Sequence, residues 1–183
     1  MRREENMITI LSDYTRQEAG ERLEQKLRER KIETELIAIA DLYVDPCYSC
    51  GGCTNKTYGQ CIHRDDADII LPKLMRTDVL VMVTPVKWGS YSFKMKRIFD
   101  KCAVIGDRHY YCKNGELVKG KIGRVHTFVA IGVKAQWVDA EKRAFKNLVE
   151  ENIKIMNIRG RAYLADDSNL SDCLETVAEG LSK

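Results

Sequence analysis

Short apolar runs alternate with amphipathic segments along this chain, and the pattern predicts five strands and five helices. The apolar runs of strand length span residues 7–11, 35–40, 78–84, 125–131 and 161–164. Segments rich in helix-forming residues follow them at 16–30, 66–75, 92–102, 139–156 and 170–181. Ala19, Leu23 and Leu27 recur every four residues, so we expect this face of the first helix to lie on a sheet.

This strict alternation predicts a doubly wound, parallel α/β sheet, because each parallel pair of strands needs a right-handed helical crossover. The common solution at this size is five strands in the order 2-1-3-4-5 with helices on both faces. Ligands of such sheets bind outside the carboxyl ends of the strands, near the switch point between strands one and three. The loops that leave at this edge begin at Ser12, Asp41, Thr84 and Gly132. Residues 105–121 carry turn signals and look irregular, with room for a hairpin.

Composition narrows the class of protein. The 183 residues suffice for one well-packed domain, and we expect residues 1–183 to form it, with 41–65 as a long inserted loop. The net charge of +3 arises from 30 basic and 27 acidic residues mixed along the chain, which argues against a nucleic-acid partner. No apolar run approaches the roughly 20 residues that span a bilayer, and the start of the chain does not resemble a signal peptide. We therefore expect a cytoplasmic protein with no membrane association.

The strongest chemical signal follows the strand at 78–84, where the chain reads Thr84, Pro85, Val86, Lys87, Trp88, Gly89 and Ser90. With Lys96 and Asp100 on the next helix, this segment resembles the NADPH-dependent FMN reductase and iron-sulfur flavoprotein families. In those families a T-P-x-x-W/Y-G-S loop wraps the flavin. The resemblance implies a flavodoxin-like fold, FMN as cofactor, a nicotinamide nucleotide as electron donor, and residues 84–90 as the flavin loop. The residues agree, because Pro85 ends a strand and Gly89 allows close approach of a flat ligand. The alternative is a plain turn with Trp88 in the core.

Four of the seven cysteines crowd into the 41–65 loop, as Cys47, Cys50, Cys53 and Cys61. Their C-x2-C-x2-C-x7-C spacing resembles the motif that holds a [4Fe-4S] cluster in iron-sulfur flavoproteins, and the short spacers allow thiolates to converge. Zinc also suits four thiolates, and related simple flavoproteins resemble this segment, so cluster, zinc and unligated thiols all stay open. Because this loop leaves its strand at the edge of the flavin loop, its placement favours redox use. The remaining cysteines are isolated and are interpreted as small hydrophobic side chains: Cys102, Cys112 and Cys173.

The segment after the first strand is the candidate phosphate site. The families usually carry G-S-x-R there, whereas this chain keeps the arginine as Arg16 but has Asp13 and Tyr14 at the glycine and serine positions. Asp13 would repel a phosphate unless its carboxylate turns away. The implied phosphate ligands are Ser12, Thr15 and Arg16. In an equally ordinary interpretation Thr15 caps the helix and Arg16 is solvated.

A second flavin-contacting loop is implied after the strand at 125–131. Gly132 permits close approach of a ligand there, and Trp137 is placed either to cover a flavin ring or to anchor the helix that follows. The histidines show no paired spacing and are assigned no role: His63, His109 and His126.

These residues predict an FMN-dependent oxidoreductase that passes electrons from NAD(P)H through the flavin to an acceptor that the sequence does not name. FMN is expected and not FAD, because one short loop seats one phosphate. With a cluster, the protein would be an iron-sulfur electron carrier. The alternative is a non-enzymatic zinc- or thiol-based sensing protein with a vestigial flavin site. The 41–65 loop and the 105–121 excursion exceed what a small core needs, so we expect a homodimer or tetramer.

Overall fold

A five-stranded parallel sheet forms the centre of the computed structural model, which describes residues 6–15, 18–121 and 123–182. Its strands are β1 (Ile8–Ser12), β2 (Thr34–Ala38), β3 (Val79–Pro85), β6 (Thr127–Val133) and β7 (Arg159–Ala165). The order across the sheet is β2-β1-β3-β6-β7, and every pairing is parallel. Numbered over these five strands alone, this is the predicted order 2-1-3-4-5, so the predicted fold class is confirmed.

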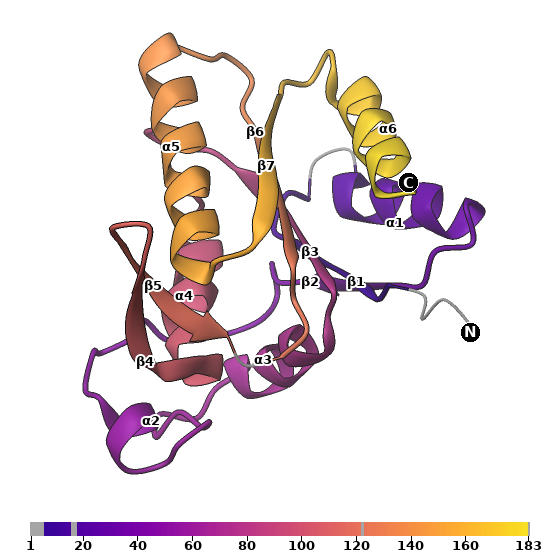
Figure 1. The fold of residues 1–183 in the computed structure, drawn as a ribbon. Coiled ribbons are helices and arrows are strands. Elements are labelled where there is room, and N and C mark those ends of the chain that lie inside the picture. The colour runs from indigo at the N-terminus through magenta and orange to yellow at the C-terminus, as the bar shows by residue number, and fades with distance from the viewer. Residues whose placement is uncertain (1–5, 16–17, 122, 183) are drawn as a thin grey trace.

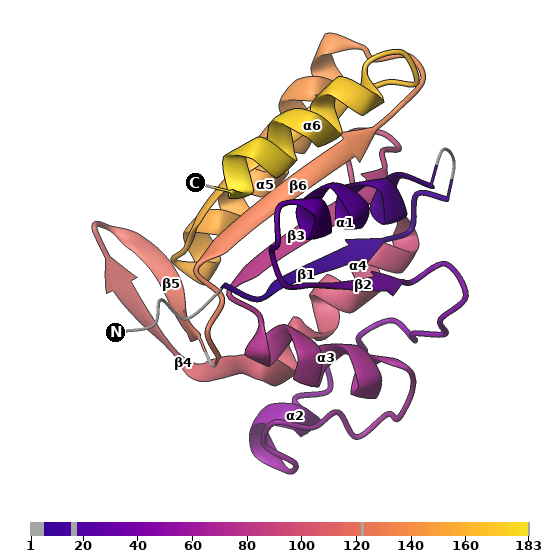
Figure 2. The same cartoon turned by 90° about the vertical axis from the view of Figure 1, so that its right-hand side faces the viewer.

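Helices cover both faces of the sheet, as Figures 1 and 2 show. On one face lie α1 (Ala19–Glu29) and α6 (Leu170–Leu181), and on the other lie α3 (Ala67–Arg76), α4 (Phe93–Lys101) and α5 (Asp139–Met156). Side chains of β3 alternate between the two layers: Val81 packs with α1 and α6, whereas Leu80 and Met82 pack with α3, α4 and α5. Because both faces of β3 are covered, residues 79–83 are all apolar, without the polar positions of a half-exposed strand.

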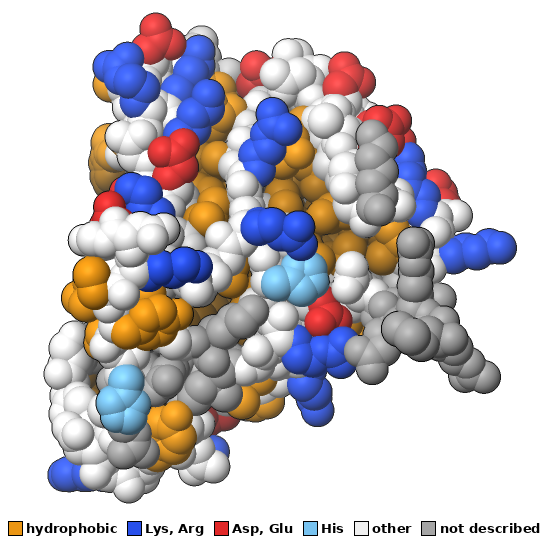
Figure 3. Space-filling view, in the orientation of Figure 1, with side chains coloured by type: hydrophobic (Ala, Val, Ile, Leu, Met, Phe, Trp, Pro, Cys, Tyr) orange, Lys and Arg blue, Asp and Glu red, His pale blue; other side chains and the backbone are white. Residues whose placement is uncertain are grey.

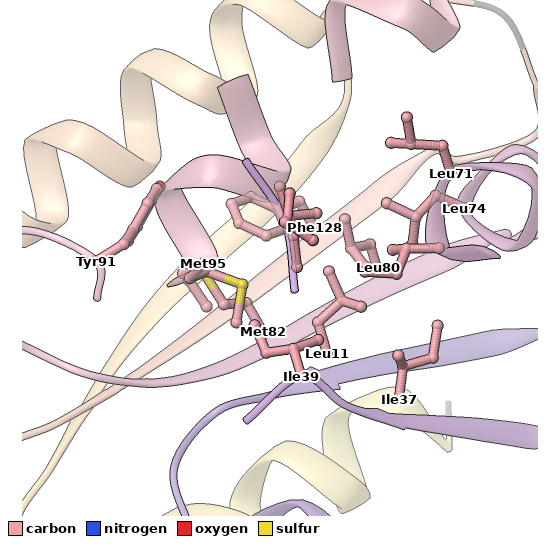
Figure 4. Packing of buried hydrophobic residues seen from close by; sticks show 14 of the residues in the cluster. Leu11, Ile37, Ile39, Leu71, Leu74, Leu80, Met82, Tyr91, Met95 and Phe128 are labelled. Atoms are coloured by element: carbon pink, nitrogen blue, oxygen red, sulfur yellow. The ribbon is translucent and has the colours of Figure 1, made fainter. Parts of the chain in front are cut away.

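The larger core layer joins strands to helices that lie far apart in the sequence. Figure 4 shows Leu11, Met82 and Phe128 from three strands packed with Leu74 of α3 and Met95 of α4. Phe128, Met82 and Met95 are completely buried. Because full burial of a side chain of this size stabilises a fold by roughly 1.5–3 kcal/mol, this layer holds α4 firmly on the sheet. The predicted flavin loop precedes that helix, and the cysteine-rich loop lies against its end.

Three features differ from the sequence-based prediction. Residues 105–121 are mostly regular: a 3-10 turn, η2 (Cys102–Ile105), leads into an antiparallel hairpin of β4 (Gly106–Lys113) and β5 (Glu116–Lys121). The loop at 41–65 contains a single helical turn, α2 (Gly52–Asn55). Helix α1 begins at Ala19, because Glu18 has a left-handed backbone with φ 49°, and residues 16–17, with which the predicted helix begins, lie outside the described residues. Within the described part of the chain, no helix combines the length and hydrophobicity needed to cross a bilayer.

Candidate functional site

The predicted flavin loop, residues 84–90 and called the flavin loop below, projects from the carboxyl end of β3. Thr84 and Pro85 are the last residues of that strand, as expected of a proline that ends it. The backbone N–H groups of Lys87 and Ser90 donate to each other's carbonyl oxygens, at 3.2 and 3.0 Å, and close a tight turn. Both central residues are left-handed, with φ 52° at Trp88 and 72° at Gly89, which matches a type I′ turn.

This turn presents the Trp88 ring to solvent, where the side chain is 89% exposed. The alternative interpretation, with Trp88 in the core, is therefore wrong. Gly89 also has a packing reason, since a Cβ there would lie 2.5 Å from the Cβ of Ala144 on α5. The flavin loop thus rests on α5 and holds an aromatic ring above the edge of the sheet. The neighbouring Val86 is buried beneath it.

Asp13, at the end of β1, points toward the start of α4. Its backbone N–H donates to the carbonyl oxygen of Val83 at 3.2 Å, and its Oδ2 accepts from the Ser92 hydroxyl. Ser92 in turn caps α4, because its Oγ accepts from the N–H of Met95 at 3.0 Å. The carboxylate of Asp13 is therefore turned toward the β3–α4 junction, away from the start of α1. This orientation reduces the repulsion between the Asp13 carboxylate and a phosphate that was expected from the sequence.

Burial raises the pKa of Asp13, and hydrogen bonds from Ser92 and Thr84 oppose that rise only in part. Its Oδ1 is buried and has no hydrogen-bond partner in the described part of the chain.

An acid whose pKa is higher in the folded state destabilises the fold as pH rises from the unfolded pKa, about 3.9, through the folded pKa. Asp13→Asn removes this penalty. We expect the free energy of unfolding of Asp13→Asn to increase relative to wild type between pH 4 and pH 7, measured by urea unfolding. A difference that does not change with pH would contradict this assignment.

The start of α1 offers backbone donors for a phosphate. Its N-cap residue is Glu18, so Thr15 does not cap the helix, as the alternative interpretation supposed, and Glu18 makes no side-chain capping hydrogen bond to the described residues. Uncapped N–H groups at a helix start favour an anion. Ser12 is buried against the first turn of α1. A Cβ added to Gly20 in that turn would lie only 2.7 Å from the Cβ of Ser12. Thr15 is exposed, and Arg16 lies outside the described residues.

Gly132 and Trp137 have structural explanations. Gly132 lies inside β6, where a Cβ would come within 2.8 Å of Phe145 and of Val86. The indole N–H of Trp137 donates to the carbonyl oxygen of Ala165 at 2.9 Å, and its ring lies 6.4 Å from that of Phe145. Trp137 therefore anchors the start of α5, as one of its two interpretations supposed. Contact between Gly132 and a flavin stays a prediction.

Paired aspartates close the neck of the cysteine loop, residues 41–65. The N–H of Tyr43 donates to Asp66 Oδ2 at 2.7 Å, and the N–H of Asp45 donates to Asp65 Oδ2 at 2.8 Å. Asp65 also accepts from the ammonium of Lys101, and these two side chains are only 2% and 1% exposed. Burial acts to raise the pKa of Asp65, but Lys101 and the N–H groups of Asp45 and Ala67 outweigh it and lower that pKa. The loop is thereby tied to the end of α4.

The four clustered cysteines all line one cavity of about 280 Å³. Its other wall is the end of α4 and the following turn, with Lys101, Ala103 and Val104. His63, whose ring lies 4.7 Å from that of Tyr48 between centroids and is tilted against it, lines the cavity as well. Sequence reasoning gave His63 no role, although it stands two residues after Cys61. Among the described residues no three His, Cys, Asp or Glu side chains are arranged to hold a metal ion.

The position of this cavity adds to the sequence-based prediction, which concerned only the edge at which the loop leaves its strand. The loop does leave β2 at the flavin edge, but α4 runs back from that edge and the cysteines gather at its far end. Eight residue steps of about 1.5 Å separate Phe93 from Lys101, or roughly 12 Å. Figure 2 shows α2 below α3, away from the tips of the strand arrows. The two candidate sites therefore lie at opposite ends of one helix.

Comparison with known proteins shows the family to which the chain belongs. The family model for NADPH-dependent FMN reductase matches residues 13–168. The chain belongs to the NADPH-dependent FMN reductase family. It is thus a member of a family of flavin-dependent oxidoreductases, and residues 13–168 include the flavin loop, the cysteine loop and α4 together.

Relatives within this family include iron-sulfur flavoproteins of archaea. One from Methanosarcina thermophila is 31% identical over 152 residues, which cover 83% of this chain and 71% of the relative. Another, from Archaeoglobus fulgidus, is 26% identical over 148 residues, covering 78% and 69%. An NAD(P)H:quinone oxidoreductase from Methanothermobacter marburgensis has a similar structure, with TM-score 0.68, 14% identity, and coverage of 97% and 98%. An FMN-dependent NADH-azoreductase from Bacillus anthracis, in complex with FMN, has TM-score 0.64, 13% identity, and coverage of 97% and 96%.

The residues present fit both groups that the family and its relatives imply. At the carboxyl edge of the sheet, the start of α1 has no side-chain cap among the described residues, Asp13 turns its carboxylate away from it, and the Trp88 ring is exposed, and these features are compatible with FMN. At the other end of α4, four thiols face one cavity, which is a donor set for iron or zinc. Cys173 is unsuited to bind a metal as a thiolate, because burial raises the pKa of its thiol to about 11.

Proposed function

We propose that this chain binds FMN at the carboxyl edge of its sheet and uses it to pass electrons from NAD(P)H to an acceptor. The observation that carries the proposal is the Lys87–Ser90 turn, which holds an 89% exposed Trp88 ring at the end of the central strand, beside the switch point. FMN, when bound, supplies the exchange of electrons itself. The protein binds and orients it.

Each part of the edge has a role in this proposal. The N–H groups at the start of α1 hold the phosphate, together with Ser12, Thr15 and Arg16. Backbone groups of the flavin loop hold the ring system, and Trp88 covers it. Lys87, in the same turn, lies where a cation stabilises negative charge near the ring. No side chain has to act as a general acid or base.

Trp88→Ala tests the role of the exposed ring. Because the side chain is almost fully exposed, we expect the free energy of unfolding to change by less than about 0.5 kcal/mol. Stacking of an aromatic side chain on a flat ligand contributes about 1–3 kcal/mol, so the dissociation constant for FMN should rise by about 5- to 150-fold. Fluorescence titration of flavin into apoprotein measures it. Unchanged FMN affinity would remove Trp88 from the site.

Reduction of the bound flavin tests the activity. Anaerobic mixing of the flavin-loaded protein with NADPH, or separately with NADH, should bleach the flavin absorption. If dithionite bleaches the flavin and neither nucleotide does, the proposed nicotinamide-dependent activity is wrong.

A [4Fe-4S] electron carrier is the finer form of this function. Its support is the single cavity shared by Cys47, Cys50, Cys53 and Cys61, with relatives that are named iron-sulfur flavoproteins. A zinc- or thiol-based sensor with a vestigial flavin site remains the rival. The orientation of Asp13 weakens it, because the altered phosphate loop was its best support. Seven free thiols suit a reducing compartment, so we place the protein in the cytoplasm.

We propose that residues 1–183 form one domain. We also propose that the protein is a homodimer or a homotetramer of such chains. In Figure 3, hydrophobic side chains gather over the hairpin and the adjoining part of α5. Exposed residues of these elements include Tyr110, Tyr111, Leu117 and Ile155. Apolar surface of this kind is typical of protein interfaces. Light scattering at micromolar concentration should give at least twice the mass of one chain, and a monomer would refute the proposal.

A further inference from the structure

A second cavity lies between the start of α4 and the segment that follows β2. We call it the α4 cavity. It has a volume of about 200 Å³ and is lined by Ile39, Leu42, Tyr43, Val44, Phe93, Lys94, Arg97 and Ile98. It is separate from the cysteine cavity, with which it shares no lining residue. Apolar side chains form part of its wall, and the rest is aromatic and cationic.

Two cations of the α4 cavity are not neutralised by carboxylates. Lys94 donates to the carbonyl oxygen of Ala40, and Arg97 donates to that of Val44 at 3.1 Å. Neither forms a salt bridge in the described part of the chain. A carbonyl oxygen accepts one hydrogen bond without cancelling a full charge, and an ammonium has three donors and a guanidinium five. Donors and positive charge therefore remain for an anionic ligand.

Nearby carboxylates are engaged elsewhere. Asp13 exerts an electrostatic influence on Lys94, but its Oδ2 is bonded to Ser92. Asp45 accepts from the hydroxyl of Tyr43 at 2.7 Å. Each carboxylate keeps its charge and lowers the positive potential of the cavity, but in the described part of the chain neither forms an ion pair with Lys94 or Arg97, whose remaining N–H donors are left for a ligand.

Two large aromatic rings are exposed at the same cavity. Tyr43 is 64% exposed and Phe93 is 66% exposed, although apolar rings of this size are usually buried. The guanidinium of Arg97 lies 5.3 Å from the centroid of the Phe93 ring. Exposed rings beside free cations suit a ligand that combines a heteroaromatic ring with phosphate, since rings stack and guanidinium binds phosphate through paired hydrogen bonds.

The cavity also lies beside the proposed flavin loop. Phe93 is the first residue of α4, three residues after Ser90, the last residue of that loop. We propose that the α4 cavity binds the phosphate-bearing adenosine end of the nicotinamide nucleotide. This inference rests on the proposed function, and it assigns to Phe93, Arg97 and Lys94 a nucleotide-binding role in addition to their contacts within the chain.

Arg97→Gln tests the charge. The probe is adenosine 2′,5′-bisphosphate, titrated calorimetrically into flavin-loaded protein at low ionic strength, because it carries ring and phosphates without redox chemistry. We expect its dissociation constant to rise about tenfold in Arg97→Gln, as for the loss of one charge-assisted hydrogen bond. Arg97→Lys should lose less, and Phe93→Ala should weaken binding several-fold. The KM for NADPH should rise in parallel at unchanged kcat.

The matched control is Lys96→Gln, which removes the same charge from the same helix at a position outside the cavity, where Lys96 pairs with Asp100. It should bind the probe like wild type. The inference is overturned if Arg97→Gln and Phe93→Ala bind the probe as tightly as Lys96→Gln. It is also overturned if they change only the oligomeric state in light scattering, which would make this face an interface between copies. If wild-type flavin is reduced by NADPH and the probe does not bind, the inference fails while the proposed function stands. If no nicotinamide nucleotide reduces the flavin, the proposed function itself has failed.

Discussion

Lys101→Met is expected to lower the free energy of unfolding by about 3–5 kcal/mol, measured by urea unfolding at pH 7. The ammonium of Lys101 and the carboxylate of Asp65 are almost completely buried together. Removal of the lysine leaves the carboxylate charged, desolvated and without its cation. The two backbone N–H groups that also donate to Asp65, from Asp45 and Ala67, compensate for only part of that loss.

Two variants separate this effect from a general loss of charge. Lys96→Met breaks an exposed ion pair with Asp100 on the same helix, and we expect a change below about 0.5 kcal/mol. Combining Lys101→Met with Asp65→Asn should recover part of the lost stability, because no buried charge then remains. If Lys101→Met is no more destabilising than Lys96→Met, the pair is not the tie that holds the cysteine loop.

The pH dependence of the same pair has a defined sign. The pKa of Asp65 is lower in the folded state, so its contribution to stability is present above the unfolded pKa of about 3.9 and is lost as pH falls through the folded value. The stability difference between wild type and Lys101→Met should therefore shrink on acidification below about pH 4. Asp13 behaves in the opposite way, because its pKa is raised in the folded state and its charged form lowers stability as pH rises.

Replacement of any one of Cys47, Cys50, Cys53 or Cys61 with serine is expected to remove most of the iron from anaerobically prepared protein. Each thiolate would supply one bond to iron in a [4Fe-4S] cluster, and a serine hydroxyl is a poor substitute. Flavin content should largely survive, because the flavin loop lies at the other end of α4 and does not depend on the cysteine loop. Elemental analysis of iron, acid-labile sulfide and zinc, together with flavin absorption, measures all of these.

Cys112→Ser is the matched control, since Cys112 is exposed on the hairpin and lies outside the cysteine cavity. Cys102→Ser and Cys173→Ser should also leave iron unchanged. Wild-type protein that contains flavin but neither iron nor sulfide would refute the cluster and leave the simpler reductase. Zinc without sulfide would instead support the metal-binding alternative.

Local pattern sufficed to predict the sheet but not the position of the cysteines. The apolar run that became β3 and the spacing of Ala19, Leu23 and Leu27 are short-range signals, and they define strands and helix faces directly. The hydrogen bonds that orient the sites join distant residues, such as Asp13 with Ser92 and Asp65 with Lys101. No periodicity reports such pairs.

The two tryptophans show the same limit. Trp88 and Trp137 each follow a strand of the sheet, and both had a core and a flavin interpretation. In the structure Trp88 is exposed on a turn with two left-handed residues, whereas Trp137 donates to Ala165 and packs against Phe145. Backbone handedness and a tertiary hydrogen bond decided between the interpretations, and neither is encoded in residue type.

The identity of the cofactor tests the central proposal most directly. Mass spectrometry of the material released from anaerobically purified protein should find FMN, close to one per chain, because the short segment between β1 and α1 can seat one phosphate. FAD as the only tightly bound flavin, or protein that stays colourless and does not take up added FMN, would contradict it.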